Sequence, residues 1–229
     1  MAASRPTEHR SKEDAVGDAR HIPAVTVSRL PVYLQALHDA AQRKVTTVSS
    51  NDLAEAAGVN SAKVRKDLSY LGSHGTRGIG YAVDELTREI SLVLGLVTER
   101  AVVIVGAGNL GRALASYDGF TRRGFVLTAI VDNDPDVIGM YVGDLRVEPF
   151  TQLPQIVRDR SVEIAVVAVP AHVAQEVAQA ACRAGVTALL NFAPTYLSVD
   201  PSVSVRTVDF SSELQILSFY AQRANAAAL

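Results

Sequence analysis

The stretch that decides the fold is Ala101-Val102-Val103-Ile104-Val105, followed directly by Gly106-Ala107-Gly108-Asn109-Leu110-Gly111. The short run of Val and Ile predicts a strand that is buried on both faces. In the turn that follows, Gly106 allows the tight bend, Gly108 lets the backbone approach a pyrophosphate, and Gly111 lets the next helix pack closely on the strand. The N-terminus of that helix then faces the negative charge. The stretch therefore predicts a dinucleotide-binding turn.

An acidic residue at the end of the next predicted strand supports this interpretation. The run Phe125–Val131 predicts the strand, and Asp132 follows Gly111 by 21 residues. A carboxylate at this place accepts hydrogen bonds from the adenosine ribose and repels the 2′-phosphate of NADP, which favours NADH and NAD+ as cofactors. The alternative is a glycine-rich turn in an unrelated α/β domain.

The second half of the chain alternates apolar runs with helical segments. Further strands are predicted at Val162–Val169, Val186–Leu190 and Val203–Val208. Such alternation predicts an α/β fold with a Rossmann-like, doubly wound parallel sheet, in which ligands lie across the carboxyl ends of the strands. Phe192 is equally well explained as a packed loop aromatic. The candidate cofactor-binding residues are Gly106, Ala107, Gly108, Asn109, Leu110, Gly111, Asp132, Asn133, Val169, Pro170, Asn191, Phe192, Ala193 and Pro194.

The first part of the chain predicts a winged helix-turn-helix. Helical periodicity begins near Ser28, Ser49 or Ser50 can cap a second short helix, and a third helix ends at Gly72. Three glycines between residues 75 and 80 mark a tight ribbon. Three helices followed by a ribbon are typical of a DNA-binding module.

The third helix presents cations on the face opposite its apolar stripe. With Val64 pointing inward, the spacing of about 100° per residue turns Arg65 and Lys66 outward. Such side chains neutralise phosphates or read guanine edges, and Arg77, between glycines, fits a narrow minor groove. The alternative is a solvated helix face without a partner. The candidate DNA-binding residues are Ser61, Ala62, Lys63, Arg65, Lys66, Ser69, Tyr70, Thr76 and Arg77.

Composition limits the remaining possibilities. The chain has 229 residues, a net charge of −2 and one cysteine, Cys182, which excludes an intrachain disulfide and fits a cytoplasmic protein. No apolar run is long enough to cross a bilayer. His172 is the best candidate for a catalytic proton donor, but it is explained more simply as a surface histidine at the start of a helix. Cys182 is better explained as a buried residue of an apolar helix than as a nucleophile. The sequence predicts neither catalytic residues nor a metal site.

The predicted organisation divides the chain into five segments. These are a segment (1–21) that is either a disordered tail or an arm that contacts DNA, a winged-helix domain (22–84), a connecting helix (85–99), a Rossmann-like NAD(H)-binding domain (100–210) and a C-terminal helix (211–229).

Together these motifs resemble the Rex family of redox-sensing transcriptional repressors, from about Val27 to Arg223. The most specific matches are Val64-Arg65-Lys66-Asp67-Leu68-Ser69-Tyr70-Leu71-Gly72, Gly75-Thr76-Arg77-Gly78-Ile79-Gly80-Tyr81, the Gly106–Gly111 turn, Asn191-Phe192-Ala193-Pro194 and Val208-Asp209-Phe210. The resemblance implies a homodimer that binds a palindromic double-stranded DNA operator and is released by NADH.

The resemblance also implies roles for single residues. It implies a C-terminal helix that is swapped between subunits. The segment from Ser211 to Ala227 fits that role, since Ser212 can cap it with Gln215 three residues on. It places Tyr117 and Asp209 near the nicotinamide at the domain and subunit junction, with Phe210 beside the ring. Two residues depart from the family pattern. Gln35 stands where many relatives have Arg, which puts an Arg contact to Asp209 in doubt, and His74 replaces a frequent wing Tyr.

These observations predict a repressor that senses the NADH/NAD+ ratio and is not an enzyme. One alternative is an NAD-dependent oxidoreductase with a helical appendage, which requires turnover that depends on His172. Another is a sensor of CoA or another nucleotide that binds DNA but ignores redox state, against which Asp132 counts.

Overall fold

The computed structural model describes residues 22–73, 75–76 and 78–227, and the chain forms two compact units, Met1–Thr98 and Glu99–Leu229. The predicted tail at 1–21 lies outside the described residues, as do His74 and the candidate site residue Arg77. No helix among the described residues is long and apolar enough to span a membrane.

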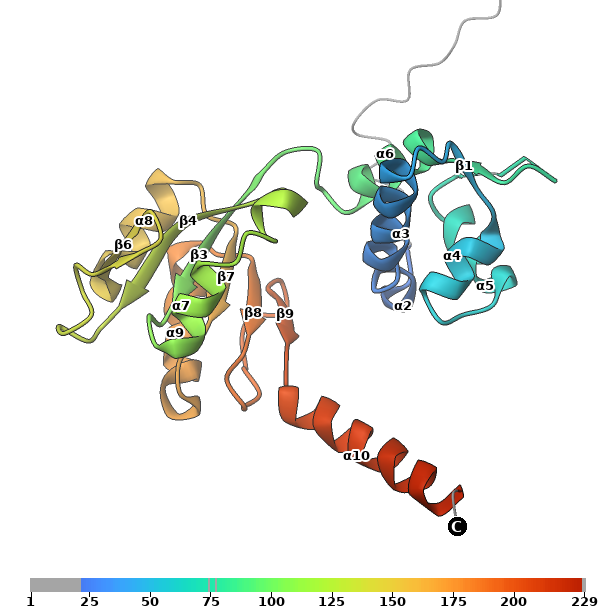
Figure 1. The fold of residues 1–229 in the computed structure, drawn as a ribbon. Coiled ribbons are helices and arrows are strands. Elements are labelled where there is room, and N and C mark those ends of the chain that lie inside the picture. The colour runs from blue at the N-terminus through green and yellow to red at the C-terminus, as the bar shows by residue number, and fades with distance from the viewer. Residues whose placement is uncertain (1–21, 74, 77, 228–229) are drawn as a thin grey trace, which may run out of the picture. The chain divides into compact units, whose positions relative to one another are not determined.

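The N-terminal unit is a winged helix-turn-helix (Figure 1). Its elements are α2 (Ala24–Val27), α3 (Leu30–Gln42), β1 (Thr47–Val48), α4 (Ser50–Ala56), α5 (Ser61–Ser69), β2 (Tyr81–Ala82) and α6 (Val83–Val93). Strands β1 and β2 pair antiparallel, and a bridge between Thr76 and Gly80 closes the wing beyond them. Side chains from α3, α4, α5, α6 and both short strands form one buried apolar core.

Polar side chains fix where the two helices of the turn begin. Ser49 caps α4 and forms a capping box with Asp52, whose carboxylate accepts from the Ser49 backbone N–H at 2.7 Å. Asn60 caps α5 by accepting from the backbone N–H of Lys63 at 2.8 Å. The turn between the two helices is therefore set by local hydrogen bonds.

The helix predicted over 85–99 is shorter than expected and belongs to the N-terminal core. Helix α6 ends at Val93 because Gly95 adopts a left-handed conformation (φ 70°), and the Leu96 N–H bonds to the Ser91 carbonyl, as in a Schellman ending. Ile90, on the inner face of α6, is fully buried.

The second unit contains a seven-stranded sheet in the order β5-β6-β4-β3-β7-β8-β9, in which only the β5–β6 pair is antiparallel among the described strands. Its strands are β3 (Arg100–Val105), β4 (Phe125–Asp132), β5 (Tyr141–Val142), β6 (Leu145–Pro149), β7 (Ile164–Val167), β8 (Ala188–Asn191) and β9 (Ser204–Thr207). Its helices are α7 (Asn109–Ala115), η1 (Thr121–Arg123), η2 (Phe150–Gln152), α8 (Leu153–Asp159), α9 (Ala171–Ala184) and α10 (Phe210–Ala227).

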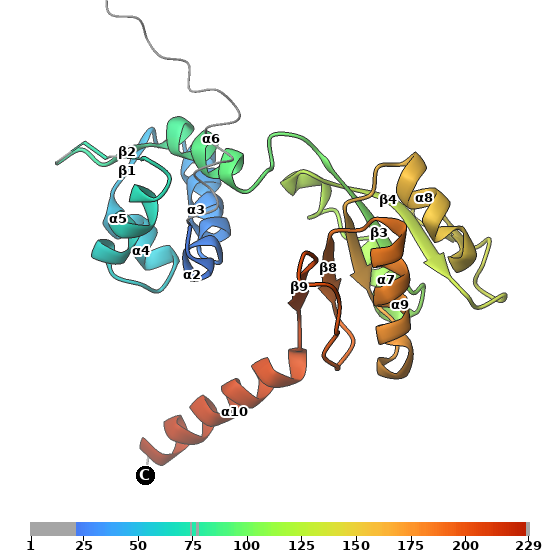
Figure 2. The same ribbon diagram turned by 180° about the vertical axis from the view of Figure 1, so that it is seen from behind.

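Helices cover both faces of this sheet (Figures 1 and 2). Val103 and Val105 of β3 face the core beneath α8 and α9, whereas Val102 and Ile104 face the core on the side of α7. Alternate residues of one strand are thus buried on opposite sides, as the continuous Val and Ile run predicts. The doubly wound α/β architecture is confirmed.

The β5–β6 hairpin was not predicted. Strand β5 has only two residues, too few for a periodic signal, and the turn after it uses Gly143 in a left-handed conformation (φ 58°). Val142 and Val147 nevertheless bury their side chains in the sheet core. The alternation of Leu145, Val147 and polar neighbours was the available signal.

Candidate nucleotide site and candidate DNA-binding face

Helix α5 presents its cations to solvent, as the sequence predicts. Val64 and Leu68 are fully buried, whereas Lys63, Arg65 and Lys66 are exposed. The neighbouring candidates Ala62, Ser69 and Thr76 are also exposed, and Ser61 and Tyr70 are half-buried. The described candidates therefore form one accessible surface along α5 and the wing.

A buried polar cluster on the opposite side of α5 was missed by the sequence analysis. The Asp67 carboxylate accepts from the Arg29 guanidinium through two bonds of 2.7 Å, from the Tyr33 hydroxyl at 2.8 Å and from the Thr26 hydroxyl at 2.9 Å. Its side chain is 3% exposed. The four residues tie the start of the domain to α5, and we call them the Asp67 cluster.

The surroundings of the Asp67 cluster shift the pKa values of its members. Burial alone raises the pKa of Asp67, but hydrogen bonds from Arg29, Tyr33 and Thr26 outweigh it, so the pKa lies below its usual value. Burial and the hydrogen bond to Asp67 raise the pKa of Tyr33 to about 12. The bond to Asp67 also raises the pKa of Arg29. At neutral pH the cluster thus contains one ion pair and a neutral phenol.

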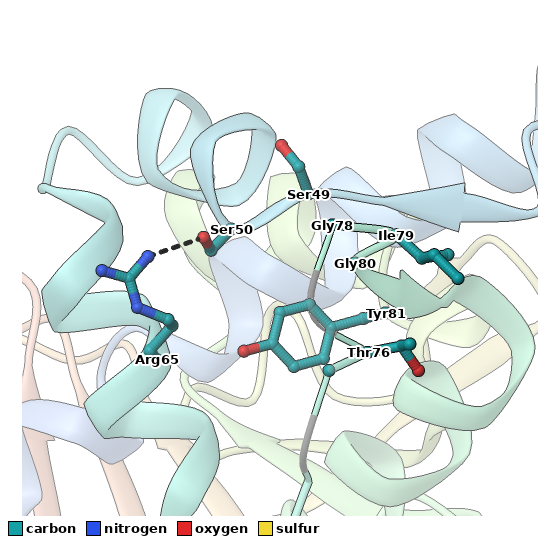
Figure 3. Close-up of a pocket in the computed structure, with 9 residues that line it drawn as sticks. Ser49, Ser50, Arg65, Thr76, Gly78, Ile79, Gly80 and Tyr81 are labelled. Atoms are coloured by element: carbon teal, nitrogen blue, oxygen red, sulfur yellow. Dashed lines mark hydrogen bonds between the residues drawn. The ribbon is translucent and has the colours of Figure 1, made fainter.

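A hollow of about 500 Å³ lies between α4, α5 and the wing (Figure 3). Arg65 borders it and donates from Nη1 to the Ser50 hydroxyl at 3.1 Å. Tyr81 also lines it, and in Figure 3 its hydroxyl points to the side on which Arg65 and Ser50 lie. Ser50 and Tyr81 were not among the sequence candidates.

In the second unit, the glycine-rich turn adopts the close packing that its motif predicts. Gly106 has φ 105°, and a Cβ there would run into the Ala168 carbonyl at the end of β7. A Cβ on Gly111 would run into the Gly106 carbonyl. Gly108 is exposed with open space around it, which leaves its backbone accessible. This cradle fits a pyrophosphate at the N-terminus of α7.

Asp132 lies beside this turn at the end of β4. Its Oδ2 accepts from the Ala107 backbone N–H at 2.6 Å, and its Oδ1 accepts from the N–H groups of Asn133 and Asp134 at 2.7 and 2.9 Å. The carboxylate is thus fixed against the turn. In a bound dinucleotide the ribose hydroxyls would be the groups that donate to it.

A hollow of about 150 Å³ opens next to Asp132. Its wall is largely apolar, as an adenine ring requires, and Glu176 of α9 adds a second carboxylate that was not predicted. The lining residues are Val105, Gly106, Asp132, Asn133, Phe150, Val169, Val173, Glu176 and Val177. The structure thus brings together four of the predicted cofactor residues.

Hydrogen bonds from the Asn191 side chain fix the conformation of the loop after β8, and this side chain is not exposed. Asn191 is fully buried, its amide donates to the carbonyls of Ala193 and Thr195, and its Oδ1 accepts from the Ala193 N–H at 2.9 Å. Phe192 then faces Phe210, with ring centroids 6.0 Å apart and planes inclined by 34°. Phe210 is 59% exposed, which leaves this aromatic pair open to a ligand.

Tyr117 lies apart from that aromatic pair. Its ring packs edge-on against Phe120, with centroids 5.4 Å apart. It borders a different hollow, together with Leu127 and Asp144, and none of the residues described as lining that hollow belongs to the glycine-rich turn. A role for Tyr117 near the nicotinamide therefore remains a prediction.

The C-terminal helix begins one residue earlier than predicted, and Ser212 is not its cap. Asp209 accepts from the Ser211 N–H at 2.9 Å and from the Ser212 hydroxyl at 2.7 Å, and these two bonds hold the pKa of Asp209 below its usual value. The prediction failed because the carboxylate, a stronger acceptor than a hydroxyl, takes the capping role.

Three other sequence candidates have ordinary environments. The Gln35 amide donates to Asp39 one turn along α3 at 2.8 Å. His172 is exposed near the start of α9, and burial raises the pKa of the half-buried Cys182 thiol. The last two lie where the sequence analysis placed them.

The fold and the two sites define a winged-helix DNA-binding protein with a dinucleotide-binding domain. Two family models match it: "Putative DNA-binding protein N-terminus" over residues 21–69 and "CoA binding domain" over residues 97–195. The chain is 55% identical over 205 residues to the redox-sensing transcriptional repressor Rex of Streptomyces coelicolor, which covers 90% of this chain and 80% of that protein. The Rex repressor of Carboxydothermus hydrogenoformans is 48% identical, covering 88% and 97%.

Solved structures of similar fold point to the same family. The crystal structure of RSP, a Rex-family repressor, in complex with NAD+ and operator DNA has a TM-score of 0.83 at 31% identity, covering 90% of this chain and 95% of that one. RSP in complex with NADH has a TM-score of 0.82 at 30% identity, covering 91% and 98%. The chain belongs to the Rex family of redox-sensing transcriptional repressors. This confirms the predicted regulator and contradicts the oxidoreductase alternative, since these relatives are named as repressors.

Proposed function

We propose that this protein represses transcription when NADH is scarce and leaves its operator when NADH binds. The observation that carries the proposal is the presence, in one chain, of an exposed cationic recognition helix and a glycine cradle fixed against Asp132. The related repressor RSP was crystallised with NADH, and with NAD+ and operator DNA. The nicotinamide dinucleotide and the operator DNA are therefore both found bound to a structural relative of this chain.

The proposed cofactor site follows the carboxyl ends of five strands, β3, β4, β7, β8 and β9. The turn from Gly106 to Gly111 takes the pyrophosphate, and Asp132 with Asn133 takes the adenosine ribose. After β7, Val169 lines the hollow beside Asp132, and Pro170 follows it in the chain. The loop from Asn191 to Pro194 carries Phe192 toward the nicotinamide. Tyr117, Asp209 and Phe210 complete the proposed set.

Discrimination between the two redox forms follows from the charge of the nicotinamide. NADH has a neutral ring and NAD+ a cationic one. Phe192 and Phe210 carry no charge, and the nearby Asp209 carboxylate already accepts from Ser211 and Ser212. A cationic ring against this pair would therefore lack a partner, which costs several kcal/mol when the cation is buried. The aromatic pair therefore favours NADH. A switch from 1:99 to 99:1 needs about 5.5 kcal/mol of differential binding, which two cofactor sites in a dimer can share.

The proposed DNA contacts are the exposed residues of α5 and the wing. Lys63, Arg65 and Lys66 supply positive charge, and Ser61, Ala62, Ser69, Tyr70 and Thr76 supply contact surface. Arg77 belongs to this set on its sequence context alone. A pair of such units reads a palindrome only if its half-sites lie about one helical turn apart or a multiple of it.

Homodimerisation through α10 is part of the proposal. Leu214, Leu217 and Phe219 of this helix are 66%, 61% and 55% exposed, and Ile216 and Tyr220 are exposed as well. An apolar helix surface of this kind requires a partner, and exchange of α10 between two subunits supplies one. We place the protein in the cytoplasm, because its operator DNA and the NADH it senses meet there.

The test is a titration of the operator complex of the full chain with NADH, NAD+, NADPH and CoA in parallel. We expect NADH to release the DNA at far lower concentration than NAD+ or NADPH. Equal release by NADH and NAD+ would contradict redox sensing. Release by CoA alone would favour the CoA sensor that one of the two family models suggests.

A further inference from the structure

Three hydrogen-bond donors in the N-terminal unit converge from three different elements on one side of the hollow in Figure 3. They are Ser50 of α4, Arg65 of α5 and Tyr81 of β2. The Thr76 side chain lies on the other side of the Tyr81 ring in that view. Two of the three donors, Ser50 and Tyr81, have no place in the proposed DNA contacts.

Arg65 is held in a fixed direction. Its bond to the Ser50 hydroxyl occupies Nη1 and ties the guanidinium to the start of α4. Within the described part of the chain, no carboxylate forms an ion pair with Arg65. The remaining N–H groups of the planar guanidinium therefore stay available to an oxyanion, which such a group binds in a bidentate manner.

Tyr81 presents a buried ring with a free hydroxyl. The residue is 9% exposed, and its ring lies so close to Gly75 that a Cβ there would come within 2.9 Å of it. Its hydroxyl forms no hydrogen bond with any described residue. Burial raises the pKa of Tyr81 and the Arg65 charge lowers it in part, so the hydroxyl keeps its proton at neutral pH. The ring is buried but the hydroxyl oxygen is not, since no buried side-chain oxygen of the described residues lacks a hydrogen-bond partner. The hydroxyl is therefore accessible from the hollow and can donate to an acceptor from outside the protein.

No carboxylate lines this side of the hollow among the described residues. The nearby acid of α4, Asp52, lies outside the lining and accepts from the Ser49 backbone N–H instead. Ser50 accepts from Arg65 and so has its own proton free to donate. The set consists of a cation and two hydroxyl donors, which matches the charge and the acceptor oxygens of a phosphate group.

We propose that Ser50, Arg65 and Tyr81 together bind one phosphodiester of the DNA backbone. The inference rests on the proposed function and deepens it, because it separates two adjacent cations. Arg65, tied back to α4, holds the backbone and carries no sequence information. Lys66, exposed on α5 with no such tie, remains a base-reading candidate.

The experiment measures how the full chain binds two duplexes across a range of salt concentrations. One is an operator duplex that the wild-type protein selects from a random pool, and the other has an unrelated sequence. The variants are Arg65→Gln, Arg65→Lys, Ser50→Ala and Tyr81→Phe. Tyr141→Phe is the matched control, since this tyrosine is 71% exposed in the other unit. Thermal unfolding checks that every variant is folded.

We expect Arg65→Gln to weaken both duplexes by the same factor, about tenfold, and to reduce the slope of log K against log salt by about one. Arg65→Lys should keep the slope but lose affinity, because an ammonium cannot bind in a bidentate manner. Ser50→Ala and Tyr81→Phe should each weaken both duplexes by about fivefold. Tyr141→Phe should match the wild type.

Methylphosphonate substitution identifies the phosphate itself. Neutralising one backbone position at a time should reveal a position where the wild type loses affinity and Arg65→Gln does not. Loss of operator binding alone in Arg65→Gln, unchanged binding in Tyr81→Phe, or the absence of such a position would overturn the phosphate pocket. If the wild type binds the operator and NADH releases it, the proposed function stands even then. A wild type that selects no duplex from the pool would refute both.

Discussion

The two units of this chain position their candidate site residues by different means. In the N-terminal unit, hydrogen bonds between side chains position the site residues. The Asp67 cluster joins α2 and α3 to the inner face of α5, and the cations of α5 therefore face outward. In the nucleotide-binding unit, the close approach of backbone segments positions the site residues, since neither Gly106 nor Gly111 has room for a Cβ. The first unit is therefore sensitive to the loss of a polar group, and the second to the gain of a methyl group.

The largest expected effect is that of Gly111→Ala. The added Cβ would collide with the Gly106 carbonyl, and Gly106 in turn lies against the Ala168 carbonyl, so the whole turn must shift. We expect NADH affinity to fall more than about 100-fold and stability to fall by about 1–3 kcal/mol. NADH fluorescence titration and thermal unfolding measure the two effects.

Gly108→Ala is the matched control for this change. Its Cβ would meet nothing within 4 Å, so we expect stability to change by less than about 0.5 kcal/mol. NADH affinity should still fall, because the methyl group takes up space through which the pyrophosphate approaches. Normal NADH binding by Gly111→Ala would refute the importance of backbone proximity.

Asp67→Asn should have the next largest effect, and only on the N-terminal unit. The substitution leaves the Arg29 guanidinium, whose side chain is 17% exposed, without its anion. Breaking a fully buried pair typically costs about 3–5 kcal/mol, and we expect a value toward the lower end for this partly buried one. Operator binding should be lost while NADH binding is retained. Denaturant unfolding followed by tyrosine fluorescence tests this, with the exposed Asp118→Asn as control. Equal destabilisation by both variants would contradict the role of the Asp67 cluster.

The same cluster predicts a loss of stability at alkaline pH. The folded-state pKa of Tyr33 is raised to about 12, so its contribution is complete below the unfolded value near 10 and is lost as the pH rises from about 10 to 12. The loss should amount to about 1–3 kcal/mol. Unfolding measured at pH 9 and at pH 11.5 tests it. Tyr33→Phe should remove this part of the pH dependence, and an unchanged profile in that variant would assign the loss to other groups.

Asp132→Ala should have the smallest effect. We expect NADH affinity to fall about tenfold, the value of one or two hydrogen bonds, and NADPH affinity to fall less, because the repulsion of the 2′-phosphate disappears. Parallel titrations with both nucleotides give the ratio, and Asp136→Ala, an exposed neighbour, is the control. If the ratio of NADH affinity to NADPH affinity equals that of the wild type, Asp132 does not contribute to the preference for NADH.

The sequence predicted the parts of the fold that depend on local patterns. The Val and Ile runs located five strands of the large sheet, and the glycine turn was correctly placed between β3 and α7. The outward face of α5 followed from Val64 and the helical period. Each of these signals is contained within a few neighbouring residues.

The features that the sequence could not predict depend on distant partners or on competition between neighbours. The sequence analysis assigned Asp67 no separate role, because its partners Thr26, Arg29 and Tyr33 are 34 to 41 positions away. The hollow beside Arg65 needs α4, α5 and the wing together. Asp209 and Ser212 competed for one capping position, and the pattern alone did not decide between them.

The most direct test is the release of the operator by NADH from the wild type and from Gly108→Ala, compared by fluorescence anisotropy. Because the substitution lies in the nucleotide-binding unit, both proteins should bind the operator equally well without NADH. We expect NADH to release the wild type and to leave the Gly108→Ala complex intact over the same concentration range. Release of both complexes at the same NADH concentration would show that the glycine cradle does not control DNA binding.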